Sequence, residues 1–288
     1  MGSKQVGNVL VGVTGWGDHD VLYPAGTRPG DKLSLYAGHF PTVEVDATFY
    51  AIQPKKNVEA WIDQTPEHFR FVVKAHQSMT GHKRQGQGER STAHVFKAFR
   101  ESIQPLVETN KLGMVLFQFP PWVDFQEKYT TYIRKCRQFF GEWPLAVEFR
   151  HKSWFASENR QVTLDFLQRE GIIHVVCDEP QMGDGCVPIV PVVTVRDKSL
   201  VRFHGRNRVG WQNTGQPNWR KVRYHYRYSR EELNEWALRI QDIASQAEEV
   251  IVLFNNNSQG DAVPNARELI DIMGLRYDSL APRQMEWF

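Results

Sequence analysis

The stretch that decides the fold begins apolar and ends charged: Leu145-Ala-Val-Glu-Phe-Arg150. Such a run is typical of a buried strand, and side chains alternate along a strand, so Glu148 and Arg150 share one face. Seven runs of this chain change in the same way from apolar to polar. If the apolar alternate residues face helices, the polar ones point into a barrel near its C-terminal mouth, where barrel enzymes build their sites.

Eight short runs rich in β-branched and aromatic residues recur, mostly separated by helical patterns. They are Val9–Trp16, Val43–Phe49, Phe69–His76, Leu112–Phe119, Leu145–His151, Ile172–Asp178, Leu200–His204 and Val250–Asn255. Strands that alternate with helices imply parallel pairing through crossovers. We therefore predict an α/β protein with a single (β/α)8 TIM-type barrel domain over residues 1–288, a normal length for that fold.

The helical segments carry their own end signals, with one exception. Ser229 with Glu232, and Asp124 with Glu127, have the spacing of capping boxes. Between the sixth and seventh runs, residues 182–193 contain two prolines and repeated valines, which argue against a helix. We predict an irregular crossover there, or a loop that folds over the site; the sequence assigns no role to residues 179–199.

Composition excludes few functions. The formal net charge of +2 imposes no global field that would require a nucleic-acid or membrane partner. Three cysteines without a C-x-x-C pair argue against a secreted disulfide framework, and Cys136 and Cys177 fit buried thiols. With no signal-like segment and no run long enough to span a bilayer, we expect a cytoplasmic protein without a membrane partner.

The polar strand ends predict a site for an anion. Glu148 is the first candidate for a general acid or base, and His204 the second. Asp46 and Lys74 are expected to assist, and Asp178 to complete a ring of titratable groups. Candidates for substrate binding are the arginines Arg150, Arg202 and Arg206, the amides Gln118 and Asn255, and the aromatic residues Trp16 and Tyr50. For each aromatic residue alone, plain packing is the commoner explanation.

The strand-end motifs resemble those of the family named domain of unknown function 72, which covers nearly the whole chain in order. The matching stretches are Gly12-Val-Thr-Gly-Trp16, Glu44-Val-Asp-Ala-Thr-Phe-Tyr50, Phe71-Val-Val-Lys74, Leu116-Phe-Gln-Phe-Pro-Pro121, Val147-Glu-Phe-Arg-His-Lys-Ser-Trp154, Val201-Arg-Phe-His-Gly-Arg206 and Phe254-Asn-Asn-Asn257 with Asn265-Ala266. The resemblance implies a TIM-type barrel and no particular activity. Family members usually have Asn-Ser before Phe-Tyr, whereas this chain has Asp46-Ala47-Thr48 there.

A divalent metal is possible at the mouth but not favoured. The oxygen and nitrogen ligands would come from Glu44, Asp46, His76, Glu148, Asp178 and His204. However, Lys74, Arg150 and Arg202 crowd the same mouth and would repel a cation. We therefore assign no metal ligand, and other cofactors are not identified by the sequence.

Two loops offer further cationic groups. Residues 202–230 hold eight arginines or lysines, no acid and several aromatic residues, a composition that suits phosphates and stacked bases. Residues 80–90 form a glycine-rich candidate lid with Lys83 and Arg84.

The expected partner is an anionic small molecule bearing phosphate or carboxylate, acted on by acid–base chemistry. The alternatives are a nucleic-acid-binding or endonuclease-like protein that uses residues 202–230, and a non-catalytic metabolite sensor.

Overall fold

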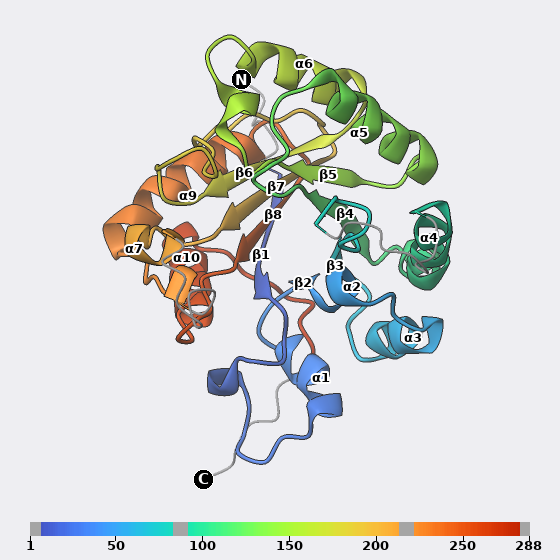
Figure 1. The fold of residues 1–288 in the computed structure, drawn as a ribbon. Coiled ribbons are helices and arrows are strands. Elements are labelled where there is room, and N and C mark those ends of the chain that lie inside the picture. Colours follow the sequence, from blue (N-terminus) through green and yellow to red (C-terminus); the bar gives the residue numbers. More distant parts are fainter. Residues whose placement is uncertain (1–6, 83–91, 213–221, 283–288) are drawn as a thin grey trace, which may run out of the picture.

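The structure is a computed structural model that describes residues 7–82, 92–212 and 222–282. Its centre is a closed barrel of eight parallel strands in the order β1 to β8, each paired with the next and β8 with β1 (Figure 1). The strands are β1 Asn8–Thr14, β2 Thr42–Val45, β3 Arg70–Lys74, β4 Leu112–Gln118, β5 Leu145–Glu148, β6 Ile173–Asp178, β7 Lys198–Phe203 and β8 Glu249–Phe254. The predicted TIM-type barrel is confirmed, with each predicted strand shifted or trimmed by a few residues.

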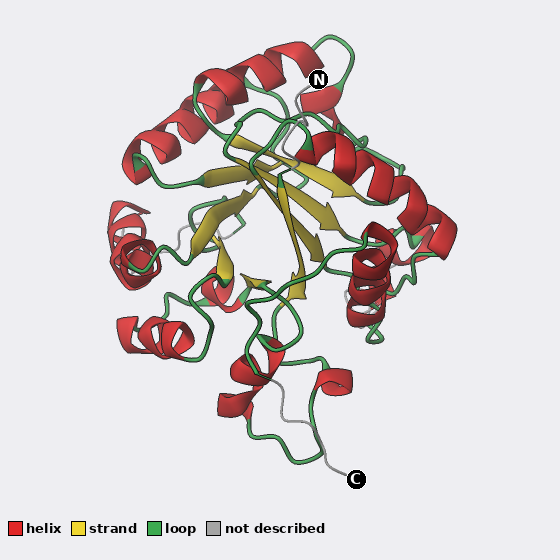
Figure 2. Cartoon of the chain, turned by 180° about the vertical axis from the view of Figure 1, so that it is seen from behind, coloured by secondary structure: helices red, strands yellow, loops and turns green. Residues whose placement is uncertain are grey.

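Helices surround the barrel (Figures 1 and 2). The α-helices are α1 Lys32–Tyr36, α2 Ala47–Tyr50, α3 Lys55–Asp63, α4 Thr92–Glu108, α5 Glu127–Phe140, α6 Arg160–Arg169, α7 Arg208–Trp211, α9 Arg230–Ala244 and α10 Ala262–Met273, and the short 3-10 helices are η1 Asp20–Leu22, η2 Pro29–Asp31 and η3 Lys152–Phe155. The hydrophobic core is continuous between strands and helices, since Phe203 of β7 packs on Trp236 of α9 and Phe117 of β4 packs on Phe140 of α5. In the described part of the chain, no helix is long and apolar enough to cross a membrane.

The connection between β6 and β7 has no helix, as predicted. Residues 179–197 run as irregular chain, in which Val187 and Val190 are buried. Three hydrogen-bond contacts tie this chain to the start of β6. His174 Nε2 lies 3.0 Å from the Val190 carbonyl oxygen, the His174 amide donates to the Thr194 hydroxyl oxygen, and that hydroxyl donates to the Ile172 carbonyl. This crossover therefore covers the barrel with extended chain that begins at the mouth.

Of the two predicted capping boxes, one is confirmed and one is wrong. The Ser229 hydroxyl accepts from the Glu232 amide while the Glu232 carboxylate accepts from the Ser229 amide, which starts α9. The N-cap position of α5 is Gln126 rather than Asp124, and the Gln126 side chain makes no cap hydrogen bond but donates to the Asp124 carboxylate. A local side-chain bond thus replaced the expected cap.

Gly12 of β1 allows this strand to pack closely against Thr42 of β2. A Cβ atom at this position would lie 2.1 Å from the Thr42 carbonyl oxygen, which is backbone and cannot rotate away. We expect Gly12→Ala to lower the free energy of unfolding by about 1–3 kcal/mol, the usual cost of overpacking. Gly17→Ala is the matched control, because a Cβ there meets nothing within 4 Å. Urea denaturation of both variants checks this; equal stabilities would contradict it.

Candidate functional site

Three strand ends meet at one buried ion pair network. Arg202 of β7 donates through Nε and Nη2 to both oxygens of Glu44 on β2, at 2.9 and 2.6 Å. Its Nη1 donates to Glu148 Oε2 on β5. All three side chains are fully buried. One guanidinium therefore joins β2, β5 and β7 near their C-terminal ends, although none of these strands is paired with another.

Glu148 is the hub of the site. Its Oε1 accepts from Gln118 Nε2 at 2.7 Å and from Arg150 Nη1 at 3.3 Å, and lies 3.1 Å from His204 Nε2. Burial alone would raise the pKa of Glu148, but the charge of Arg202 and the contacts of His204 and Arg150 outweigh it and hold the pKa well below its usual range. Glu148 is thus a buried, ionised carboxylate that accepts several hydrogen bonds.

His204 is a neutral imidazole in a fixed orientation. Burial lowers its pKa to about 3, against the opposing effect of Glu148. Asn255 Nδ2 lies 3.2 Å from His204 Nδ1. Because an amide nitrogen only donates, Nδ1 accepts and Nε2 carries the proton that points at Glu148.

Arg150 lies between two carboxyl groups and an indole ring. Its Nη2 is 3.0 Å from Glu179 Oε2, and its guanidinium carbon is 4.7 Å from the centre of the Trp211 ring. Glu179 Oε1 accepts from the Val187 amide at 2.6 Å. Burial raises the pKa of Glu179 to about 7, in spite of the charge of Arg150. Glu148 and Glu179 therefore flank one guanidinium with pKa values moved in opposite directions.

The remaining predicted acid–base pair lies at the partly exposed edge of this cluster. Lys74 Nζ is 2.7 Å from Asp46 Oδ1, with side chains 13% and 31% exposed, and lies 4.7 Å from the centre of the Phe49 ring. Burial disfavours the charged form of Lys74, but the negative charges of Asp46 and Glu44 outweigh this effect. The pKa of Lys74 is therefore raised. The structure thus brings together Glu148, His204, Arg150, Arg202, Gln118 and Asn255, while Lys74 and Asp46 pair beside them.

Asp178 does not belong to the ring that we predicted. Cys177 pairs in register with Arg202 and shares its inward side, so Asp178 points outward to the helices. Its carboxylate accepts from Arg206 at 2.6–3.1 Å, from Tyr228 at 2.8 Å and from Trp236 at 2.6 Å. Arg206 also donates to Glu232 at 2.6 Å. The prediction that Asp178 faces the barrel interior was wrong, because the residue before it faces inward. Arg206 lies beside Asp178 and is already paired with Asp178 and Glu232.

The two predicted aromatic residues differ in setting. Trp16 is partly buried and packs edge-on against Trp61 with ring centres 5.5 Å apart, and its binding role stays a prediction. Tyr50 is 64% exposed and packs on Phe49. Its binding role stays a prediction.

The basic stretch is largely paired with acids where the structure describes it. Arg227 lies 3.8 Å from Asp261, and Arg230 lies 3.5 Å from Glu268. Residues 213–221 of this stretch, and Lys83 and Arg84 of the candidate lid, lie outside the described residues. These pairings leave less free positive charge for a phosphate backbone than the composition indicates.

The three residues that come nearest to a metal-binding geometry among those described are Glu148, Cys177 and His204. Their ligand atoms lie within 4.8 Å of one another. Arg202 Nη1 donates to Glu148 and lies 3.4 Å from His204 Nε2, so a cation would meet a guanidinium. Burial also raises the pKa of the Cys177 thiol well above its usual value, which disfavours the thiolate that metals need. The residues do not fit a metal centre.

Sequence reasoning missed Glu179 and Trp211 as members of the site. Glu179 follows the sixth strand directly, but the strand parity that we assumed favoured Asp178. Trp211 was noted only as one aromatic residue of the basic stretch. Glu44 was considered as a metal ligand, whereas in the structure both of its carboxylate oxygens accept hydrogen bonds from Arg202.

The Glu179 carboxyl group predicts a pH-dependent contribution to stability. The folded chain keeps this proton up to about pH 7, whereas the unfolded chain loses it near 4.5. The contribution therefore declines as pH rises between these values, by about 3 kcal/mol, since each pH unit contributes about 1.4 kcal/mol. We expect Glu179→Gln to gain that much stability relative to the wild type between pH 4.5 and 7.5.

The measurement is the difference between the two proteins in urea denaturation at each pH. A difference is needed because His204 and His174, whose pKa values are lowered by burial, give slopes of opposite sign in the same window. A constant difference across the window would contradict the assignment.

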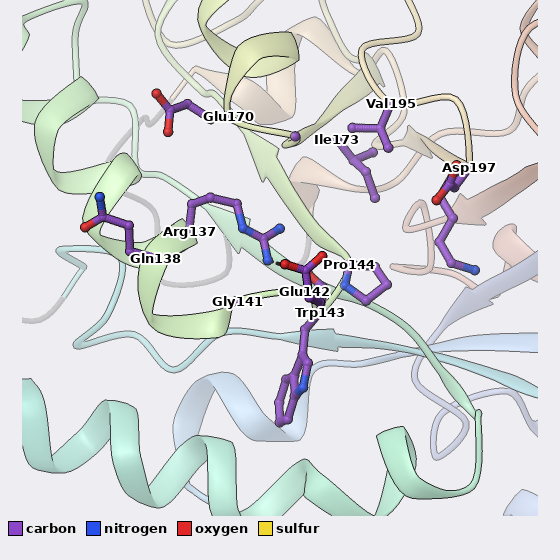
Figure 3. Close-up of a pocket in the computed structure, with 12 residues that line it drawn as sticks. Arg137, Gln138, Gly141, Glu142, Trp143, Pro144, Glu170, Ile173, Val195 and Asp197 are labelled. Atoms are coloured by element: carbon purple, nitrogen blue, oxygen red, sulfur yellow. Dashed lines mark hydrogen bonds between the residues drawn. The ribbon is translucent and has the colours of Figure 1, made fainter.

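A cavity also lies at the opposite end of the barrel. It has a volume of about 450 Å³ and lies near the start of β6 and β7, with Ile173, Asp197 and Lys198 in its lining (Figure 3). Arg137 in its wall donates to the Trp143 carbonyl oxygen at 2.8 Å. Barrel enzymes place their sites at the other end, so this hollow is separate from the candidate site.

Comparison with known proteins gives one consistent result. A sequence model described as protein of unknown function DUF72 matches residues 10–287. The UPF0759 protein YunF of Bacillus subtilis is 49% identical over 281 residues, which are 97% of this chain and all of that protein. A crystal structure of a DUF72 family protein from Enterococcus faecalis superposes with a TM-score of 0.90 at 35% identity, over 96% of this chain and all of the other. One from Thermotoga maritima gives 0.78 at 33% identity, over 93% and 100%.

Proposed function

This chain belongs to the DUF72 family, and from the geometry of the site we propose that it is an enzyme that performs acid–base chemistry on a small anionic substrate at the C-terminal mouth of the barrel. Arg150 binds the anion, Glu148 exchanges the proton and His204 holds Glu148 in place. The observation that carries this proposal is the convergence of Glu148, His204 and Arg150 within hydrogen-bonding distance at the ends of β5 and β7.

Substrate binding would itself activate the base. Arg150 is one of the charges that hold the pKa of Glu148 low. An anion on Arg150 compensates that charge, so the pKa of Glu148 rises toward the range in which a carboxylate removes a proton efficiently. Lys74, paired with Asp46 at the edge of the site, would stabilise negative charge that develops on the substrate.

Of the predicted arginines, Arg150 is the best suited to hold a substrate. Arg202 uses both guanidinium edges on Glu44 and Glu148, and Arg206 is paired with Asp178 and Glu232. We therefore give Arg202 a positioning role, because it fixes the orientation of Glu148.

A solvent-exchange experiment tests the proposal. Pools of small carboxylic acids and phosphate esters are incubated with the protein in D2O, and proton NMR follows loss of substrate C–H signals. We expect one substrate to incorporate deuterium or to convert to product, with Glu148→Gln protein as the inactive control. Binding of a pool member with neither exchange nor conversion would favour a metabolite sensor instead.

A further inference from the structure

One edge of the Arg150 guanidinium is buried and has no hydrogen-bond partner in the part of the chain that the structure describes. Nη1 donates to Glu148, but neither Nε nor Nη2 makes a hydrogen bond, although the side chain is only 4% exposed. Glu179 Oε2 lies 3.0 Å from Nη2 without being aligned with either of its N–H bonds, and is itself without a hydrogen bond. Buried N–H groups of a charged side chain are costly to leave unpaired.

Two neighbouring arginines show what this edge binds. Arg202 uses Nε and Nη2 to hold both oxygens of Glu44, at 2.9 and 2.6 Å. Arg206 uses the same two nitrogens to hold Asp178, at 2.8 and 2.6 Å. The fork made by these nitrogens matches the two oxygens of a carboxylate. In Arg150 the corresponding fork has no such partner among residues 7–82, 92–212 and 222–282.

The indole above Arg150 adds a further donor. The Trp211 ring centre is 4.7 Å from the guanidinium carbon, and its buried Nε1 atom has no hydrogen bond to any described residue. An oxyanion that bridges the guanidinium fork and the indole N–H would satisfy three buried donors at once.

We propose that the Nε–Nη2 edge of Arg150, with Trp211 Nε1 and the Glu179 carboxyl group, forms a subsite for a carboxylate of the substrate. This assignment names the chemical class of the substrate. It rests on the proposed function, because only that proposal makes the bound ligand a substrate. The subsite binds the carboxylate in the forked geometry of the two neighbouring pairs, and Glu179 in its acid form donates the fourth hydrogen bond.

Local charge favours a carboxylate over a phosphate. Arg150 already faces Glu148, and a dianion would add two charges beside that ionised carboxylate. A monoanion next to a protonated Glu179 adds only one charge to this cluster. The charged and titratable groups that act on Glu179 are Arg150, Glu148, Arg223, Cys177 and Cys186.

Binding should therefore be linked to one proton. Two carboxyl groups in contact share a proton more readily than they both ionise. Above about pH 7, where Glu179 loses its proton in the free protein, each bound carboxylate takes one proton up from solvent. The dissociation constant then rises up to tenfold per pH unit.

The test measures binding of acetate, with inorganic phosphate as the alternative probe, by saturation-transfer NMR between pH 6 and 9. We expect acetate to bind the wild type. Arg150→Lys keeps the charge but loses the pair of forked N–H groups, so it should weaken acetate binding at least tenfold. Trp211→Phe should weaken it about 2- to 10-fold. Arg227→Lys is the matched control, since Arg227 is half-exposed and pairs with Asp261. Glu179→Gln should abolish the pH dependence.

The outcomes separate the subsite from the proposed function. Phosphate binding that depends on Arg150, without acetate binding, would overturn the carboxylate assignment. Absence of both, in a protein that still turns over a substrate, would overturn the subsite and leave the proposed function intact. Acetate binding that depends on Arg150 and persists in Glu148→Gln supports the subsite, whatever the result for turnover.

Discussion

Replacing Arg202 with methionine is expected to lower the free energy of unfolding by about 3–5 kcal/mol, the usual cost of removing one partner from a buried ion pair network. The change leaves Glu44 buried with neither of its guanidinium bonds and takes one bond from Glu148. That loss is a large part of the total stability of an ordinary domain. Urea denaturation at pH 8 measures it.

The pH dependence of this variant, and a double variant, test whether the loss comes from the unpaired charge of Glu44. Burial already raises the pKa of Glu44 with Arg202 present. Without Arg202 the pKa rises further, so the variant should be less destabilised at pH 5, where Glu44 takes up a proton, than at pH 8. Combining Arg202→Met with Glu44→Gln removes the charge and should recover at least half of the loss. This double variant also serves if the single variant does not fold.

An exposed ion pair provides the control. Arg28 and Asp31 lie 2.8 Å apart with side chains 83% and 49% exposed. Arg28→Met should leave the unfolding midpoint unchanged, because exposed pairs contribute little. Equal effects at Arg28 and Arg202, or a double variant no more stable than the single one, would contradict the network as described.

The second large effect is on turnover. For a substrate found by deuterium exchange, Glu148→Gln is expected to lower kcat/KM by about 100- to 10,000-fold, the range for loss of a general acid or base. Glutamine keeps the shape and can still accept a hydrogen bond, but it cannot take up the substrate proton. Steady-state rates, with circular dichroism to verify folding, measure the effect.

Glu44→Gln is the matched control for this variant. Both residues are buried carboxylates on Arg202, but the contacts to His204 and Gln118 belong to Glu148. We expect the Glu44 variant to lose less than tenfold in kcat/KM. A loss at Glu44 as large as that at Glu148 would assign both residues a shared electrostatic role and remove Glu148 as the proton-transfer group.

Much of the fold was predictable because its signals are local. The period-two alternation of runs such as Leu145–Arg150 depends only on neighbouring residues, and so does the capping box at Ser229. The barrel follows from repetition of those signals along the chain. Asp124 failed as a cap because α5 begins at Glu127, two residues later than expected, and its carboxylate accepts from the Gln126 side chain instead.

The site was predictable only in part, because it depends on register. Glu148, Arg150, Arg202 and His204 converge since their strands end at the same level of the barrel. Which of Cys177 and Asp178 faces inward depends on how β6 pairs with β7, and a shift of one residue exchanges the two faces. Glu179 was missed for the same reason. Which arginine is already paired with an acid is a long-range contact that the sequence pattern does not contain.

The irregular crossover between β6 and β7 offers a route by which a proton can reach the buried Glu179 carboxyl group. Residues 179–197 form no helix, so few of their amides have the repeated hydrogen bonds that make a helix open as a unit. We expect such a segment to open locally at lower cost than the helices elsewhere in the ring. Glu179, at its first position, would exchange its proton with bulk water when this segment opens, so a fully covered carboxyl group can be reprotonated without unfolding of the barrel.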